Sequence, residues 1–128
     1  MDFNDRLKEA INSQKMPLPT SIGLPGTAES ASFYAMPGGQ VTREYMDGEK
    51  DVALAYEYVI HSQDQEAAND QLWQVQNYLE TLTDLDSQDS SYQFGGISIT
   101  SKPAFSQAEE PGFFYWVVDF TANLTTFK

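Results

Sequence analysis

The sequence predicts an α+β fold, in which a segment of helical period lies between two groups of strand-like segments. Residues 31–62 contain three runs rich in aromatic and β-branched side chains, and residues 92–127 contain two more. Between these groups, apolar residues recur every three or four positions, as in a helix packed on one side. The predicted order is therefore α-β-β-β-α-β-β, in a mostly antiparallel sheet with the helices packed on one face.

The length of the chain sets the number of domains. Its 128 residues, of which 41% are apolar, are enough for one compact domain with a real core but hardly for two. We therefore predict a single domain over residues 1–128.

Two segments have the spacing of amphipathic helices. Residues 1–14 form the first, and prolines 17 and 19 end it because proline cannot continue a helix. Residues 15–30 are a predicted loop. Residues 63–82 form the second helix, whose first turn Ser62 or Asp64 can cap. Its apolar stripe steps by four and three residues: Ala68, Leu72, Val75, Leu79 and Leu82.

Five segments have the features of strands. The first three are residues 31–36, 40–46 and 52–62, with turns at 37–39 and at the Asp47-Gly48 pair. Residues 92–101 and 113–127 are the last two, joined by a predicted polar connection that contains Phe105. At roughly 3.3 Å per residue the last strand would reach about 50 Å, so we expect it to bend or to project.

Composition and charge exclude several classes of protein. There are 19 acidic and 7 basic side chains, a net charge of −12. This charge disfavours ordinary nucleic-acid binding and would suit a wall along which nucleic acid slides without sticking, although it can equally be a solubility device. The chain has no cysteine, which excludes disulfides and thiolate sites. A charged N-terminus and the lack of a long apolar run predict a protein made in a cytoplasm, with no membrane partner.

Catalytic and metal-binding patterns are weak. His61 is the only histidine, so it cannot build a histidine-rich metal site. At the corner between a strand and a helix it is best explained as a structural residue. In the segment "TDLDSQDSS", Asp84 and Asp86 have calcium-loop spacing, but Asp89 replaces the required glycine. We predict an acidic solvated loop, no cofactor and no enzymatic activity.

Four consecutive aromatic residues, 113–116, begin the last strand. Neighbouring strand residues point to opposite faces, so these side chains cannot all enter one core. Aromatic side chains are enriched at protein interfaces. We therefore predict an oligomer or partner interface formed by Phe105, Phe113, Tyr115 and Trp116.

The element order and four segments carry a resemblance. The segments are "FNDRLKEAI", "YEYVIHSQDQEAANDQLWQVQNYLETL", "FGGISITSKPAF" and "FFYWVVDFTANL". Together they resemble the tail-terminator and head-tail joining proteins of long-tailed bacteriophages, in particular the minor capsid protein family from viruses of Gram-positive hosts. The resemblance covers nearly the whole chain as a pattern of elements.

This resemblance implies a virion protein at the head-proximal end of the tail, assembled in the host cytoplasm. It implies a ring of copies, usually hexameric, that caps the tail tube and docks onto the head connector while DNA passes through. The partners would be further copies of the chain, the tail tube protein and a head-completion protein. We place the acidic loop of Asp84, Asp86 and Asp89 at the lumen or rim of that ring.

Three alternatives stay open from the sequence. One is another component of the head-tail connector. Another is a small-ligand-binding α+β domain, with a pocket between the curved sheet and the helix of residues 63–82. A third is an enzyme that uses His61 with Asp119 or Glu57, which requires these groups to meet.

Overall fold

The computed structural model describes residues 3–16, 18–23, 29–37, 40–46, 48–85, 87, 92–109 and 113–126. For residues 40, 42, 102–109 and 113 it describes only the backbone. Two helices and six strands follow in the order α1 (Phe3–Asn12), β1 (Thr20–Ile22), β2 (Ser30–Ala35), β3 (Gln40–Glu44), β4 (Lys50–Ser62), α2 (Gln65–Thr81), β5 (Tyr92–Glu109) and β6 (Phe113–Thr126).

The six strands form one mostly antiparallel sheet with the order β1-β2-β4-β6-β5. β3 pairs with the first part of β4, and β2 pairs with its second part on the same side. β6 pairs with β4 over the whole length of β4 and with β5 on its other side. The long last strand therefore lies inside the sheet, where both of its edges are hydrogen-bonded.

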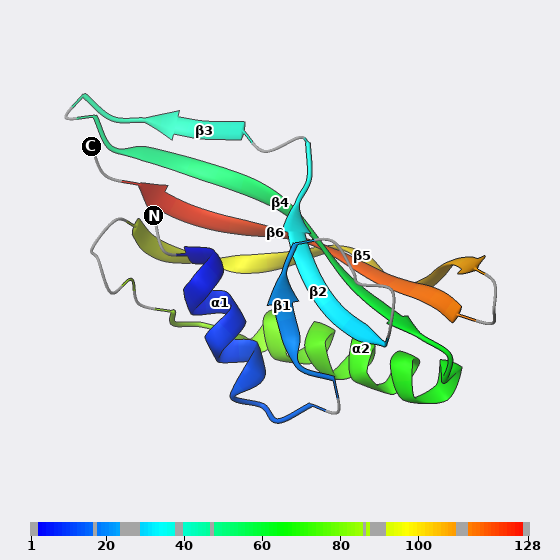
Figure 1. Ribbon diagram of the computed structural model, residues 1–128. Helices are drawn as coiled ribbons and strands as arrows, with labels where there is room; N and C mark the ends of the chain where they lie inside the picture. The colour runs from blue at the N-terminus through cyan, green and yellow to red at the C-terminus, as the bar shows by residue number, and fades with distance from the viewer. Residues whose placement is uncertain are drawn as a thin grey trace.

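Both helices pack on one face of this sheet, as the sequence predicted (Figure 1). Alternate residues of β4 and β6 point towards the helices, and their side chains merge with the helix stripes into one helix-side core. The core is fully closed, because its largest side chains have no exposed surface. These side chains include Phe3, Leu7, Phe33, Tyr58, Leu72, Leu79 and Phe120.

The predicted loop of residues 15–30 contains a strand that the sequence did not indicate. β1 has only three residues and pairs in parallel with β2. Side chains hold its backbone in place: Asn12 bonds to both the N–H (2.7 Å) and the carbonyl (3.0 Å) of Thr20. Gln71 of α2 likewise bonds to the N–H and the carbonyl of Leu18. These tertiary contacts hold the strand in place. Its three residues are too few to show the alternation by which a strand is recognised in a sequence.

The predicted polar connection after residue 101 is also strand, which corrects the sequence-based boundary. β5 runs on to Glu109 and pairs with β6 through several register shifts. One shift lies between Ser101 and Ala104, where Pro103 cannot donate a ladder hydrogen bond. This part of the sequence is mostly polar and lacks the apolar alternation that indicates a strand. Its pairing depends on the backbone of β6, which the local sequence does not record.

Candidate assembly surface

The sheet face turned away from the helices carries the groups of chemical interest, and we call it the outer face. The strand register places the side chains of Tyr34, Glu57 and Asp119 there in one row across β2, β4 and β6. Four residues further along the strands, His61 and Tyr115 form a second pair. All five positions alternate with helix-side core residues, so they point away from α1 and α2.

Two carboxyl groups face each other in the first of these rows. Glu57 and Asp119 are direct partners in the β4–β6 ladder, and the Tyr34 hydroxyl donates a hydrogen bond to Glu57. Like charges directly opposite one another destabilise a sheet unless a proton or a cation lies between them. Burial and the neighbouring Glu57 carboxyl raise the pKa of Asp119 to about 6. Burial and the bond to Glu57 also raise the pKa of Tyr34 to about 12.

His61 is a buried residue of the outer face. It is 2% exposed, and its ring stacks on that of Tyr115 with centroids 4.7 Å apart and planes tilted by 26°. Glu57 lies four residues earlier on the same strand, about 13 Å away at the usual rise of a strand. Asp119 is the ladder partner of Glu57, so it lies about as far from His61 as Glu57 does. His61 is therefore not within hydrogen-bonding reach of either carboxyl named for the enzyme alternative.

The corner after His61 is built from polar contacts. Ser62 donates to the Glu29 carboxylate at 2.9 Å, and the Gln63 N–H donates to the same oxygen at 3.2 Å. Asp64 is the N-cap of α2 and accepts from the Ala67 N–H at 3.1 Å. Of the two predicted caps, Asp64 is the one used, while Ser62 ties the corner to the loop before β2.

The predicted aromatic interface is divided between the two faces. Trp116 points to the helix side and packs half-buried against the core, whereas Tyr115 lies on the outer face against His61. The backbone of Phe105 pairs with Trp116, and that of Phe113 pairs with Glu109. The side chains of Phe105 and Phe113 lie outside the described part of the structure.

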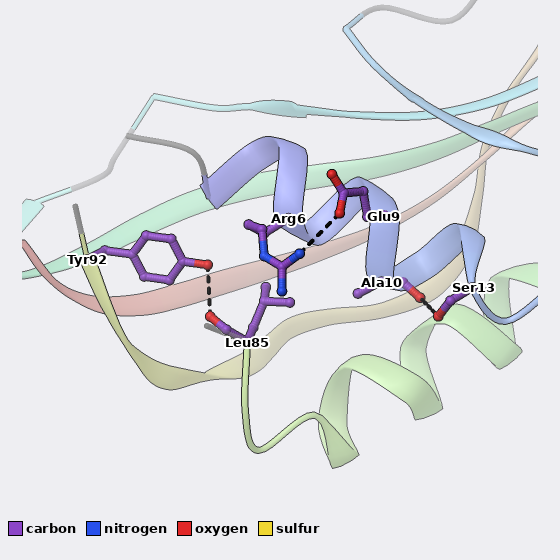
Figure 2. Close-up of polar contacts among 6 residues, drawn as sticks. All are labelled: Arg6, Glu9, Ala10, Ser13, Leu85 and Tyr92. Atoms are coloured by element: carbon purple, nitrogen blue, oxygen red, sulfur yellow. Dashed lines mark hydrogen bonds and ion pairs between the residues drawn. The ribbon is translucent and has the colours of Figure 1, made fainter. Parts of the chain in front are cut away.

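The predicted acidic loop begins at an anchored point. Asp84 is exposed, while Leu85 beside it is buried and its carbonyl accepts a hydrogen bond of 2.8 Å from the Tyr92 hydroxyl. Figure 2 shows this contact, with Arg6 of α1 nearby paired to Glu9. Asp86 and Asp89 lie outside the described residues. Tyr92 therefore holds the first part of the loop against the core.

Comparison with known protein families shows which family the chain belongs to. A family model described as "Bacteriophage tail terminator protein" matches residues 10–126, which is most of the 128-residue chain. The chain belongs to this bacteriophage tail terminator family. No curated protein matches it.

The tail terminator family is one of structural tail proteins. No group of three or more potential metal-ligating side chains occurs among them. Neither described helix has the length and apolar run needed to cross a membrane. Among the groups on the outer face, the carboxyl pair is the one that periodicity could not have revealed, because it depends on the register between β4 and β6.

Proposed function

We propose that this protein is a ring-forming tail terminator that caps the tail tube at its head-proximal end and docks it onto the head connector. The match to the tail terminator family over residues 10–126 carries this proposal. The ring would be built from copies of this chain, usually six in the families that the sequence resembles. Assembly would take place in the host cytoplasm before the tail joins the head.

The two faces of the sheet would have different roles in such a ring. The helix-side core holds each subunit together, and the outer face offers half-buried polar and aromatic groups to other molecules. Tyr115 would contribute to an interface from that face, in line with the enrichment of tyrosine at hot spots. Phe105 and Phe113 are proposed to contribute from the paired ends of β5 and β6, together with the part of Trp116 that the core leaves exposed.

The net charge of −12 suits a channel through which DNA passes without being retained. An acidic wall repels phosphate over a range of about 8 Å at physiological salt. We place Asp84, Asp86 and Asp89 at the lumen or rim for this reason.

The alternative of a small-ligand site between sheet and α2 has no support in the described residues. Fully buried side chains, among them Tyr58, Leu72 and Phe120, fill that space. We therefore do not propose it as a second function.

Two measurements test the proposal: the mass of the assembled protein and its ability to stop the growth of tail tubes. Light scattering over a wide range of protein concentration should give a stable mass several times 14.4 kDa, near six times if the ring is hexameric. Purified protein added to growing tail tubes should stop their elongation, as seen by electron microscopy. A monomer at all concentrations, together with tubes of unchanged length, would refute the proposal.

A further inference from the structure

Exposed apolar side chains concentrate on the hairpin formed by β3 and the start of β4. Five large apolar side chains are exposed among the described residues, and Val41, Tyr45 and Met46 of this hairpin are three of them. Met46, at the turn, is fully exposed. In Figure 1 the hairpin lies at the edge of the sheet, away from both helices. Clustered exposed apolar groups mark interaction sites more often than single ones do.

The hairpin is held in a defined shape. The Tyr45 N–H bonds to the Glu49 carbonyl at 2.8 Å, and Gly48 closes the turn with a φ of 92°, which favours glycine. The Tyr45 hydroxyl donates to Asp51 at 2.9 Å, and the Arg43 guanidinium lies over the Tyr45 ring at 5.1 Å. Such an arm loses little conformational freedom when it binds.

The base of the hairpin adjoins a small hollow in the sheet. Its volume is about 260 Å³, below the usual size of a ligand pocket and of the right order for one or two side chains. Gly95 allows β5 to approach closely there, because a Cβ at this position would lie 2.8 Å from the Asn123 carbonyl oxygen. The hollow is lined by Asp51, Val52, Gly95, Asn123, Leu124 and Thr125.

Asp51 links the hairpin, which forms the arm, to the hollow through hydrogen bonds. Its carboxylate accepts from Tyr45 at the arm and from the Thr125 hydroxyl, at 2.7 Å, in the wall of the hollow. The two features therefore keep a fixed relation to each other. The full exposure of Met46 also shows that the arm does not fill the hollow of its own chain.

We infer that Met46, at the turn of this hairpin, inserts its side chain into the Asp51–Asn123–Gly95 hollow of a neighbouring copy of the chain. Methionine is unbranched and flexible, so it fits an irregular recess of this size. Tip and hollow are different surfaces, so the contact is heterologous, and heterologous contacts close into rings when the rotation allows. The inference rests on the proposed ring and assigns one of its contacts.

Disulfide trapping tests the contact directly, because the chain contains no cysteine of its own. In Met46→Cys/Asn123→Cys, mild oxidation should give a ladder of covalent oligomers at multiples of 14.4 kDa on a non-reducing gel. Mixing the two single variants should give a covalent dimer only. The matched control is Met46→Cys/Asn77→Cys, whose second cysteine lies on the exposed side of α2, and it should give no ladder.

A loss-of-contact variant adds a second readout. Met46→Ser should weaken association by about tenfold, the effect of removing one buried apolar side chain. Met46→Leu should keep most of the affinity. Neither substitution should change the thermal melting of the subunit, because Met46 is fully exposed in the single chain.

The outcomes separate this inference from the proposed function. If the parent protein forms a ring but the double-cysteine variant cross-links no better than its control, the hairpin contact is wrong and the ring stands. Covalent dimers without larger species would show a two-fold contact and overturn the heterologous arrangement. A parent protein that stays monomeric at all concentrations would overturn both.

Discussion

The two faces of the sheet are made by the same strands and do different work. On the helix side, residues such as Tyr58 and Phe120 are fully buried in an apolar core. On the outer face, the alternating residues Glu57 and Asp119 form a half-buried acidic pair. Burial of apolar surface drives folding, whereas the opposed carboxyls cost stability unless they share a proton. The helix-side face therefore stabilises the single chain, whereas the outer face carries two groups whose repulsion works against it.

The largest effect is expected from breaking the helix-side core. Leu72→Ala or Leu79→Ala should lower the free energy of unfolding by about 2 to 5 kcal/mol, because each removes a fully buried side chain and leaves a cavity. Gln74→Ala on the exposed side of the same helix is the control and should change it by less than about 0.5 kcal/mol. Urea melts measure both, and an effect below about 1 kcal/mol for both leucines would mean that the stripe is not packed.

A smaller effect should distinguish the two aromatic neighbours on β6. Trp116→Ser should lower stability by about 2 kcal/mol, since Trp116 packs half-buried against the core. Tyr115→Ser should weaken assembly more than folding, by about tenfold in the dissociation constant. Thermal melts and light scattering on each single variant separate these roles. If Tyr115→Ser collapses the melting temperature and leaves assembly intact, the outer face is ordinary core at that point.

The carboxyl pair should make stability depend on pH. The pKa of Asp119 is about 6 in the folded protein, above its ordinary value of 3.8. Between these values the folded state binds more protons than the unfolded state, so stability should fall as pH rises from about 4 to 6. After allowance for solvent screening we expect a loss of about 1 kcal/mol.

Urea midpoints measured across that pH range test the carboxyl pair. Asp119→Asn should flatten this part of the profile, because it removes the titrating group, and Glu57→Gln should reduce it. Asp70→Asn, on the exposed side of α2, is the control and should keep the slope of the parent. A parent profile that rises between pH 4 and 6, and that Asp119→Asn does not alter, would contradict the paired-carboxyl interpretation.

The smallest effect on stability is expected at the acidic loop. Changing Asp84, Asp86 and Asp89 to lysine should shift the unfolding free energy by less than about 0.5 kcal/mol, as exposed loop substitutions usually do. The variant should nevertheless gain DNA binding that weakens with salt, and particles carrying it should deliver DNA slowly. Normal delivery and no gain in DNA binding would place the loop on the outside of the ring.

Much of the fold could be read from residue periodicity. The stripe of α2 and the alternation along β4 and β6 set which side chains face the core, because a helix or strand must bury its apolar side. The glycine at the predicted Asp47-Gly48 turn has the positive φ that such a reversal uses. β1 and the second half of β5 were missed, since Asn12, Gln71 and the backbone of β6 hold them.

The sequence by itself therefore determined the element types, the apolar faces and the acidic charge, because these depend on neighbours only a few residues apart. Only the tertiary structure decided that Glu57 meets Asp119, that Trp116 and Tyr115 serve different faces, and that the β3–β4 hairpin adjoins a hollow near Asn123. Each of these depends on strand register between distant segments. Register is set by the packing of the whole sheet on its helices, which no local pattern records.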